Sequence, residues 1–547
     1  MNVAELFVRC METEGVTHIF GVPGEENESL LFALEDSSIT FVPCRHEQGA
    51  AFIANVLGRL TGKAGVCLAT LGPGATNLIT GVADANLDKA PLFAITAQGG
   101  LDRLHHESHQ KIDIVKMFQP ITKWNGAVTS PEVVTEMICK AFREAEQEKP
   151  GATHIELSED VADLDVTHTD KPITPKRPRR PAADYKAMRQ TVALINEARK
   201  PIVLAGNGAI RKRASKHLTE FAEKHGIPVA STFMGKGALT DRSELSLGAI
   251  GLGFKDYVVE AFEASDLVIT VGYDVAEYPP EKWNIGVDKS VIHIDFDPAE
   301  VYAEYDPDLE VVGDISDALW ELNRKEDLFP HLESGWFKPV RDRIRDNLSS
   351  YRLADDEKMT VPGALHVIRE VMDDDGLLIS DVGTHKMWIA RNFPTNCPNG
   401  CLISNGMASM GIALPGAIAA SLDNPGRSIV AAMGDGGFLM NAAELETARR
   451  LGSGFVAIVF NDNDYGLISW KQHLSRQKSV STRIGNPDFP AFVKSFGVEG
   501  LRAETPAQLR DILQDRLSRH TLCVIEVPIQ TNVNNELVEE LNTYWNQ

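Results

Sequence analysis

The sequence lacks any apolar run long enough to cross a membrane. Its first seven residues carry a glutamate rather than a basic leader before an apolar stretch, which argues against a secretion signal. Basic residues are outnumbered, since 54 Lys and Arg against 77 Asp and Glu leave a net charge of −23. A nucleic acid needs a basic surface, so it is excluded as a partner. We therefore expect a cytoplasmic protein that binds neither membranes nor nucleic acid.

Cysteine is scarce and unpatterned. The seven cysteines are scattered from Cys10 to Cys523, and none forms a C-x-x-C pair. Cys397 and Cys401 lie close together, but no second ligand pair accompanies them, so a structural zinc site is not expected. Reduced thiols are the expected state.

What the chain does have is length and alternation. At 547 residues it is too long for one hydrophobic core, and roughly two to four domains are expected. Helix-like and strand-like segments alternate along it, which predicts an α/β protein with three doubly wound parallel-sheet domains. We place these domains at residues 1–165, 185–330 and 355–547. A proline-rich, basic stretch without apolar periodicity, 166–183, is predicted to be an interdomain linker.

Apolar patterning predicts individual elements in each domain. The predicted helices are 3–14, 48–60 and 442–451, and the predicted strands are 18–22, 39–44, 64–70, 92–97, 154–157, 202–205, 267–271, 291–294, 428–433 and 455–460.

Two acidic loops in the third domain form the most informative motif. Gly434-Asp435-Gly436-Gly437 follows strand 428–433, and Asn461-Asp462-Asn463-Asp464 follows strand 455–460. With a helix between them, the two strands are parallel neighbours, and both loops lie at the sheet edge where such folds bind ligands. Two carboxylates and a carbonyl suit Mg²⁺, which shares its other positions with phosphate and water. The glycines allow close approach, and the following helix N-terminus offers free N–H groups to a phosphate.

A lone GDG is often only a tight turn, but its pairing with Asn-Asp favours a metal and diphosphate site. In the central domain, Gly206-Asn207-Gly208 imitates the start of a dinucleotide fingerprint, although Arg211 stands where the third glycine belongs. A plain turn and a nucleotide site both stay open there.

The paired acidic motif resembles the thiamine diphosphate and Mg²⁺ motif of the thiamine-dependent 2-oxo acid enzymes. The resemblance implies that the side chains of Asp435 and Asp462 and the carbonyl of Asp464 bind Mg²⁺. It also assigns five neighbouring residues to the cofactor pocket: Gly436, Gly437, Tyr465, Gly466 and Leu467.

Glu47 lies where a predicted strand passes into a helix. By itself it is a first-turn acid favoured by the helix dipole. However, Arg45-His46-Glu47-Gln48-Gly49-Ala50-Ala51 resembles the activating-glutamate segment of these enzymes, which implies that Glu47 hydrogen-bonds the cofactor pyrimidine. The segment 71–77 resembles their G-P-G-x-x-N loop beside the pyrimidine. It assigns Pro73 and Asn77 to cofactor binding, together with Pro23.

Two further segments match the third domain of these enzymes. Asp381-Val382-Gly383-Thr384-His385 resembles a diphosphate-anchoring turn, although His385 read alone could be structural. The segment 405–411 resembles the one that folds the cofactor into a V. Met410 would then wedge between the two rings and the carbonyl of Ala408 would hold the amino group, whereas a methionine read alone is core filling.

Over nearly the whole chain the resemblance is closest to the catabolic, flavin-independent acetolactate synthases. The passages 109–113, 118–123, 272–278 and 292–295 carry it. It implies that Gln110 reaches the cofactor-bound substrate. The implied reaction decarboxylates pyruvate on thiamine diphosphate and adds the hydroxyethyl enamine to a second pyruvate, giving 2-acetolactate and CO₂. FAD, which biosynthetic relatives bind in the central domain, is not favoured. Active sites at subunit interfaces are implied, with a homodimer as the minimum and a homotetramer as the expected assembly.

Departures from the catabolic pattern lie close to the chemistry, at Lys111, 440–443 and 464–470. Ile468 and Trp470 are expected to shape the acceptor pocket. A thiamine diphosphate-dependent 2-oxo acid decarboxylase that releases an aldehyde therefore stays as the alternative. A flavin or nicotinamide oxidoreductase would leave Glu47 and the metal motif unexplained, and a non-catalytic paralogue would be expected to lack Glu47 or Asp435.

Overall fold

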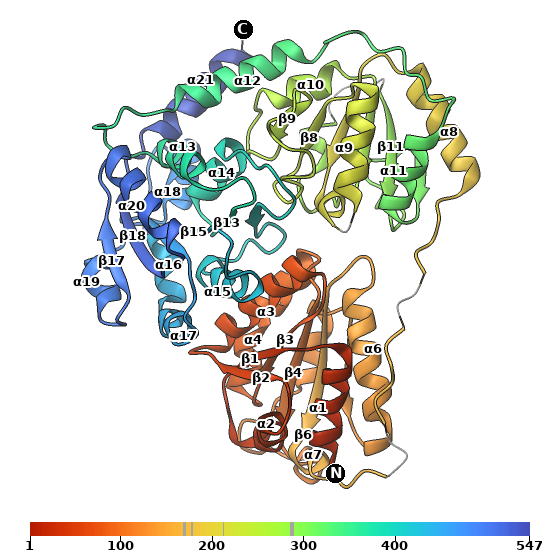
Figure 1. Cartoon of the computed structure of the whole chain (residues 1–547), viewed down its shortest axis with the longest axis vertical. Coiled ribbons are helices and arrows are strands. Elements are labelled where there is room, and N and C mark those ends of the chain that lie inside the picture. The colour runs from red at the N-terminus through yellow and green to blue at the C-terminus, as the bar shows by residue number, and fades with distance from the viewer. Residues whose placement is uncertain (168–170, 177–178, 212, 285–288, 547) are drawn as a thin grey trace.

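The computed structural model describes residues 1–167, 171–176, 179–211, 213–284 and 289–546. Three six-stranded sheets follow one another along the chain, and every strand pair within them is parallel (Figure 1). Helices cover the faces of each sheet, as the connections between parallel strands require. The predicted fold class, α/β with three doubly wound domains, is confirmed.

The first sheet has the order β2-β1-β3-β4-β6-β5. Its strands, in chain order, are β1 (His18–Gly21), β2 (Thr40–Pro43), β3 (Gly65–Ala69), β4 (Leu92–Gln98), β5 (Trp124–Val128) and β6 (Ala152–Ser158). Helices α1 (Val3–Glu14), α2 (Glu28–Glu35) and α6 (Val134–Glu146) bury apolar side chains on one face. Helices α3 (Glu47–Thr61) and α4 (Pro73–Leu87) cover the other. The sequence predicted all of these strands except the edge strand β5, whose side chains are mostly half-buried and carry no clear alternation.

The central sheet reads β9-β8-β7-β10-β11-β12. This is the Rossmann order, in which the chain starts in the middle and fills one side and then the other. The strands are β7 (Pro201–Ala205), β8 (Val229–Ser231), β9 (Ser246–Ala249), β10 (Leu267–Val271), β11 (Ser290–Asp295) and β12 (Leu309–Val312). Helices α8 (Tyr185–Glu197), α9 (Ala214–His225) and α11 (Ile315–Arg324) share one core, while α10 (Val258–Ala264) and α12 (Lys338–Ser350) lie on the other side.

The third sheet repeats the order of the first, as β14-β13-β15-β16-β18-β17. Its strands are β13 (Leu377–Ser380), β14 (Cys401–Ile403), β15 (Ile429–Gly434), β16 (Val456–Asn461), β17 (Glu499–Arg502) and β18 (Cys523–Pro528). One face carries α13 (Val361–Val371), α14 (Thr384–Asn392), α20 (Pro506–Ser518) and α21 (Val533–Trp545). The other carries α15 (Ala413–Asp423), α17 (Leu445–Arg450) and α19 (Phe489–Lys494).

The single helix predicted over 442–451 is wrong in its extent. A short helix, α16 (Asp435–Met440), begins at the acidic residue itself, and a 3₁₀ turn, Ala442–Glu444, precedes α17. Asn441 separates them because its backbone leaves helical geometry (φ −130°, ψ 21°) while its side chain donates to the carbonyl of Gly411.

One apolar core joins the first and third domains. Side chains of α3 and α4 pack in the same buried cluster as those of α15 and α17, and α3 lies directly against α15 (Figure 1). A Cβ on Gly416 of α15 would lie only 3.0 Å from Val56 of α3, so the two helices approach closely. Burial of this large apolar area holds the two domains face to face.

Each sheet has a switch point, where neighbouring strands send the chain in opposite directions. The switch lies between β1 and β3 in the first sheet, between β7 and β10 in the central sheet, and between β13 and β15 in the third. Ligands of open α/β sheets bind outside the carboxyl ends of strands at such points. All three edges are therefore candidate sites.

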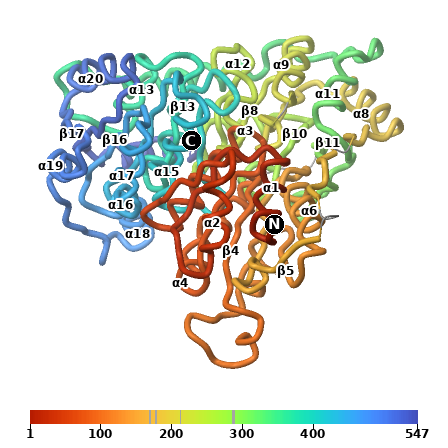
Figure 2. Tube along the Cα trace, turned by 60° about the horizontal axis from the view of Figure 1, so that its bottom comes forward, coloured from red at the N-terminus to blue at the C-terminus, as the bar shows by residue number. Residues whose placement is uncertain are grey.

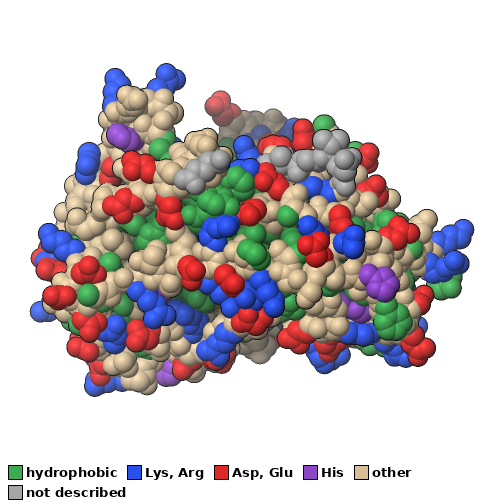
Figure 3. Space-filling view, turned by 90° about the horizontal axis from the view of Figure 1, so that it is seen from above, with side chains coloured by type: hydrophobic (Ala, Val, Ile, Leu, Met, Phe, Trp, Pro, Cys, Tyr) green, Lys and Arg blue, Asp and Glu red, His purple; other side chains and the backbone are tan. Residues whose placement is uncertain are grey.

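The predicted linker, 166–183, contains no helix or strand among its described residues, while 168–170 and 177–178 lie outside the described part. A loop between β4 and β5, residues 99–113, projects from the body of the molecule (Figure 2). On the face drawn in Figure 3, acidic and basic side chains are interspersed without a continuous basic surface. All seven cysteines are free. No helix of the described chain combines the length and apolar character that a membrane crossing requires.

Candidate functional site

The acidic loops meet at the carboxyl edge of the third sheet, next to its switch point. Asp435 follows β15 and Asp462 follows its neighbour β16, as the strand pairing predicted. Oδ2 of Asp435 accepts hydrogen bonds from the backbone N of Asn463 (2.8 Å) and from Nδ2 of Asn486 (2.7 Å). The backbone N of Asp464 donates to Oδ1 of Asp462 (3.1 Å), which tightens the loop. The predicted metal ligands are therefore brought together on one edge.

Burial disfavours the charged forms of Asp435 and Asp462. Burial and the neighbouring carboxylate of Asp435 raise the pKa of Asp462 to about 7. Burial also raises the pKa of Asp435. Adjacent carboxylates whose pKa values are raised by burial mark a position that favours a cation.

A metal site at this edge would need more than acidic side chains. Among the described residues, no group of three or more His, Cys, Asp or Glu side chains is arranged to hold a metal ion. The predicted ligand set has only two side chains, those of Asp435 and Asp462. Its third member is the backbone carbonyl of Asp464. Mg²⁺ commonly takes such a small protein ligand set and fills its octahedron with phosphate oxygens and water.

Polar atoms without partners face the same edge. Val382 and Gly383 form the turn after β13, and α14 begins with Thr384 and His385. An added Cβ on Gly466 would contact both Thr384 and Asp462, and one on Gly434, next to Asp435, would contact the ring of His385. Oγ1 of Thr384 and Nε2 of His385 are buried without a hydrogen-bond partner. Burial lowers the pKa of His385 to about 4, although a hydrogen bond to the carbonyl of Asp381 opposes this. Buried polar groups are normally paired, so orphans gathered here point to a polar ligand.

Two glycines allow the backbone of the site to pack closely against these groups. A Cβ on Gly466, at the start of α18 (Gly466–Arg476), would lie 2.6 Å from Oδ2 of Asp462 and 3.1 Å from Oγ1 of Thr384. A Cβ on Gly436 would lie 2.9 Å from the ring of Tyr465 and 3.6 Å from Cε of Met410. Six predicted cofactor residues therefore make close contacts in two sets, Asp462 with Thr384 and Gly466, and Met410 with Gly436 and Tyr465. Leu467 follows Gly466 in the same helix. A Cβ on Gly437 would instead lie 2.6 Å from Oδ1 of Asp381.

Ala408 and Met410 lie in the loop between β14 and α15, which we call the cofactor loop (residues 404–411). Ala408 has a left-handed backbone (φ +53°), which a non-glycine residue adopts only when its surroundings enforce it. The carboxylate of Asp381 accepts from the backbone N of Gly411 (2.9 and 3.0 Å) and of Ala413 (3.1 Å). The end of the loop is thus fixed to the same turn that carries Thr384 and His385.

The first domain supplies a second cluster at its own switch point. Glu47 begins α3 and is 8% exposed, and its Oε2 accepts a hydrogen bond of 2.9 Å from Nδ2 of Asn77 on α4. Pro73 is the first residue of α4, and a Cβ on the next residue, Gly74, would lie 3.4 Å from Oε1 of Glu47. Three of the predicted pyrimidine residues therefore meet around one carboxylate.

Pro23 and Gln110 approach this cluster from two loops. Pro23 follows β1, and a Cβ on its neighbour Gly24 would lie 2.8 Å from Thr70, which also lines Gly74. Gln110 lies in the projecting loop with a left-handed backbone (φ +55°), and a Cβ on Gly72 would lie 2.8 Å from its Cβ. Gln110 is exposed. In the described chain no hydrogen bond or ion pair joins Glu47, Asn77 or Gln110 to Asp435, Asp462 or Asp464.

The central switch point is closed by protein groups. The backbone N of Asn207 donates to both carboxylate oxygens of Glu277 (3.0 and 3.1 Å), and the backbone N of Asp274 donates to one of them (3.0 Å). A dinucleotide fingerprint would offer such N–H groups to phosphate. Here a side chain of the same domain takes that position, which favours the plain turn over the nucleotide site.

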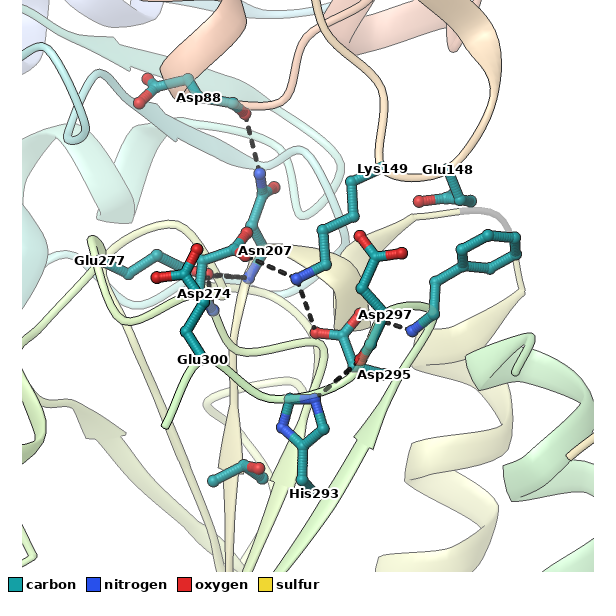
Figure 4. Close-up of polar contacts among 12 residues, drawn as sticks. Asp88, Glu148, Lys149, Asn207, Asp274, Glu277, His293, Asp295, Asp297 and Glu300 are labelled. Carbon is teal, nitrogen blue, oxygen red and sulfur yellow. Dashed lines mark hydrogen bonds and ion pairs between the residues drawn. The ribbon is translucent and has the colours of Figure 1, made fainter. Parts of the chain in front are cut away.

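A lysine from the first domain enters the same crevice (Figure 4). Nζ of Lys149 lies 2.7 Å from Oδ1 of Asp274 and 3.2 Å from Oδ2 of Asp295, whose side chain is completely buried. Burial opposes its charge, yet the two carboxylates raise the pKa of Lys149 above its ordinary value. Lys149 thereby balances the negative charge of Asp274 and Asp295.

The sequence did not single out Asn486, Asp84 or Asp88. Asn486 binds Asp435, and it stands in a Gly-Asn-Pro turn far along the chain from either acidic loop. Trp470 was expected in the acceptor pocket; it is buried, its Nε1 has no partner, and its ring meets Phe254 of the central domain edge to face at 5.7 Å. Nothing in the local sequence pointed to Phe254.

The residues present fit a thiamine diphosphate with its metal. Unpartnered polar atoms at Thr384 and His385 beside two acids whose pKa values are raised by burial suit a diphosphate with a cation.

Comparison with known proteins adds independent findings. Residues 1–117 match the thiamine pyrophosphate enzyme N-terminal binding domain, 188–322 the central domain, and 381–527 the C-terminal binding domain. The chain is 37% identical to an acetolactate synthase of Bacillus subtilis over 98% of its own length and 95% of that protein's. It is 34% identical to a catabolic acetolactate synthase of Raoultella terrigena, covering 98% and 97%. With the acetolactate synthase isozyme 1 large subunit of Escherichia coli it shares 32% identity, covering 96% and 93%.

Proposed function

This chain belongs to the acetolactate synthase family of thiamine pyrophosphate enzymes, and from that premise we propose that it decarboxylates one pyruvate and joins the remaining two-carbon unit to a second. The products are 2-acetolactate and CO₂. The observation that carries the proposal is the buried Glu47–Asn77 pair in a chain that also holds the acidic loops of Asp435 and Asp462. Both halves of a thiamine site are retained, in a sequence that aligns with acetolactate synthases almost end to end.

We propose that Mg²⁺ is held by the side chains of Asp435 and Asp462 and by the carbonyl of Asp464. The unpartnered Oγ1 of Thr384 and the ring of His385 would then bind the diphosphate. When bound, thiamine diphosphate supplies the nucleophilic carbon and the electron sink that decarboxylation of a 2-oxo acid needs. The acidic edge supports this assignment because burial disfavours the charged forms of Asp435 and Asp462, a cost that a bound divalent cation would offset.

Glu47 is proposed to hold and exchange a proton with the pyrimidine ring. Its Oε2 accepts the hydrogen bond of Asn77, and its Oε1 lies near Gly74, where it would meet the pyrimidine ring. The low exposure of Glu47 excludes water from this exchange. Gln110, exposed on the projecting loop, is proposed to bind the substrate. Pro23 and Pro73 shape the walls of the pyrimidine pocket.

A simple decarboxylase is not favoured. The three relatives described above are named acetolactate synthases, and none is named a decarboxylase.

We infer that the enzyme works without FAD. The N–H group of Asn207 is bound to Glu277, and Lys149 crosses the crevice between Asp274 and Asp295 (Figure 4). A flavin nucleotide would have to displace these contacts and bring its phosphates against three carboxylates. A visible absorption band of bound flavin in the purified protein would contradict this inference.

The proposed site draws its residues from the first and third domains. We propose a homodimer as the minimum and a homotetramer as the working form, in which Glu47 of one chain faces the Asp435 site of another, with C₂ symmetry giving two equivalent sites. We also propose domain boundaries at 1–165, 185–330 and 355–547 and a cytoplasmic location. An active, strictly monomeric species in analytical ultracentrifugation would refute the assembly.

The central experiment is product analysis. The purified protein is incubated with pyruvate, Mg²⁺ and thiamine diphosphate, and acetolactate is separated from acetaldehyde. We expect acetolactate as the main product, with no turnover when thiamine diphosphate is omitted. Acetaldehyde without acetolactate would establish the decarboxylase instead, and the absence of both would overturn the proposed function.

A further inference from the structure

The cofactor loop is held from two sides by different domains. Its end, at Gly411, is bound by Asp381 and Asn441 of its own domain. Its beginning, from Ser404 to Gly406, is bound by acids of the first domain. Ala408 and Met410 lie between the two attachments. Their position therefore depends on groups outside their own domain.

Asp88 is the first of these acids. It directly follows α4, is 1% exposed, and its Oδ1 accepts a hydrogen bond of 2.7 Å from the backbone N of Gly406. The backbone N of Asn405 lies 3.3 and 3.2 Å from its two oxygens. Nη1 of Arg59 lies 3.5 Å from Oδ2 and also donates to the carbonyl of Ile403 (3.0 Å). One carboxylate thus gathers two consecutive amides of the loop and a buried cation.

Asp84 acts one turn earlier on the same helix. It is fully buried, its Oδ1 accepts a hydrogen bond of 2.6 Å from Oγ of Ser404, and its Oδ2 accepts one of 2.9 Å from Nδ2 of Asn55. Oγ of Ser404 in turn accepts from the backbone N of Ser409 (3.2 Å), inside the loop. The chain of contacts runs from Asp84 to the residue directly between Ala408 and Met410.

The central domain joins the same point. Nδ2 of Asn207 donates to the backbone carbonyl of Asp88 (2.8 Å; Figure 4), and Nδ2 of Asn405 donates to the carbonyl of Glu277 (2.7 Å). All three domains therefore meet at Asp88 and Asn405. A Cβ on Gly406 would lie 2.9 Å from Leu87 and 3.0 Å from Oδ1 of Asp88, so the loop fits against the end of α4 only with glycine there.

Burying Asp84 and Asp88 at the interface between domains disfavours their charged forms. Burial and the neighbouring Asp84 raise the pKa of Asp88 to about 7, while Arg59 and the loop amides oppose the rise. Burial also raises the pKa of Asp84 and lowers the pKa of Lys386, which faces both acids, to about 8. Apolar residues would hold the domains together at less electrostatic cost. The carboxylates differ from apolar residues in that each accepts hydrogen bonds from particular N–H or O–H groups, which fixes the position of the loop.

We propose that Asp84 and Asp88 are positioning residues that set the geometry of the cofactor loop, and with it the pyrimidine end of the thiamine diphosphate site. This rests on the proposed function. Asn77, the partner of Glu47, lies near the start of α4. Asp84 lies near the end of the same helix, and Asp88 directly follows it. In an assembly whose active sites each combine two chains, the same helix touches both sites. A displacement of α4 at one site reaches the loop of the other.

The test is calorimetry of two ligands on the full-length protein. Thiamine diphosphate with Mg²⁺ reports the whole site, and inorganic pyrophosphate with Mg²⁺ reports only the diphosphate end. For Asp88→Asn we expect the dissociation constant of thiamine diphosphate to rise about tenfold, the size expected for charge-assisted hydrogen bonds, with that of pyrophosphate unchanged. Asp84→Asn should act in the same direction.

The matched control is Asp266→Asn. Asp266 also accepts two backbone amides, those of Arg199 (2.8 Å) and Lys200 (2.9 Å), but within the central domain and away from the loop. It should leave both affinities unchanged. Equal weakening of both ligands by Asp88→Asn, or unchanged affinity for both, would overturn the positioning role.

Gly406→Ala gives a second route if Asp88→Asn does not fold. The added methyl group pushes the loop away from Leu87 and Asp88 while leaving both acids in place, and we expect the same selective loss of thiamine diphosphate binding. Unchanged binding of thiamine diphosphate to Gly406→Ala would overturn the proposal. A wild-type protein that does not bind thiamine diphosphate with Mg²⁺ would instead refute the proposed function on which it rests.

Discussion

The side-chain amide of Asn77 donates a hydrogen bond of 2.9 Å to Oε2 of Glu47. The two residues stand in the first turns of α4 and α3, helices that follow different strands of the first sheet. A carboxylate that served only the helix dipole would need no such partner and would face water. Glu47 is buried and hydrogen-bonded through Oε2, so its Oε1 is the atom that can bind a ligand.

Glu47→Gln should lower turnover of pyruvate by a factor of about 100 or more, since it removes the group that exchanges a proton. Binding of thiamine diphosphate, measured by calorimetry, should stay within a few-fold of wild type. Glu28→Gln is the control, because Glu28 is also a first-turn acid but is exposed at the start of α2. Full activity in the Glu47 variant would remove Glu47 from the mechanism.

Asp435→Ala should abolish the Mg²⁺-dependent retention of thiamine diphosphate, because it removes one of two side-chain ligands and the acceptor that orders Asn463 and Asn486. Calorimetry with and without Mg²⁺ measures this. Asp464→Asn is the matched control. Only the backbone carbonyl of residue 464 is assigned to the metal, so the affinity of this variant for thiamine diphosphate in the presence of Mg²⁺ should change little. Unaltered Mg²⁺ dependence in Asp435→Ala would contradict the metal role.

Ile468→Ala should change the choice of acceptor. Ile468 is 51% exposed on α18, on the turn that follows Gly466. Shortening it makes room for one further methylene group, so we expect kcat/KM for 2-oxobutanoate as acceptor to rise about tenfold relative to pyruvate. Leu474→Ala, on the same helix but two turns away, should leave the ratio unchanged. If both variants give the wild-type ratio, Ile468 does not line the acceptor pocket.

Lys149→Met should destabilise the protein. It leaves Asp274 and the completely buried Asp295 without their shared cation, and breaking a buried ion pair costs about 3–5 kcal/mol. The urea midpoint measures the loss. Adding Asp295→Asn to Lys149→Met should recover part of it, because the unpaired charge is then removed. A double variant less stable than Lys149→Met would show that Asp295 is needed for another reason.

His154 should make the first domain sensitive to acid. Its side chain is fully buried against Phe118 (ring centroids 4.0 Å apart), with Nε2 bonded to Oγ1 of Thr96 (2.8 Å). Burial lowers the pKa of His154 from 6.5 to about 3. The unfolded chain therefore binds one more proton between these values, and folding stability falls as the pH drops below 6.5.

This group alone contributes a slope of about 1.4 kcal/mol per pH unit over that window. In His154→Gln the slope of stability against pH between 4.5 and 6 should be smaller by this amount, as measured from urea midpoints. Above pH 7 the stabilities of the two proteins should depend on pH in the same way. Identical slopes below pH 6 would mean that His154 titrates normally in the folded protein.

Much of the fold followed from the apolar pattern. Strands such as β7 and β10 are continuous apolar runs buried on both faces, and their lengths were predicted to within a residue or two. The edge strand β5 was missed, since an edge strand is only half-buried and its composition is less constrained. No strand was predicted at seven further positions either: β8, β9, β12, β13, β14, β17 and β18. The interruption at Asn441 was also missed, because it depends on a hydrogen bond to Gly411, a residue distant in sequence.

The sequence by itself determined the chemistry of each loop: acids after β15 and β16, a glutamate at the start of α3, and glycines where a ligand must approach. These depend on residue types at fixed spacings within one strand and helix. Only the tertiary structure decided which loops meet. Asp84 and Asp88 reach the cofactor loop across more than three hundred residues of sequence, and Glu277 closes the central turn of Asn207. Such contacts leave no local pattern, because burial fixes a polar group's need for a partner without fixing where in the chain that partner stands.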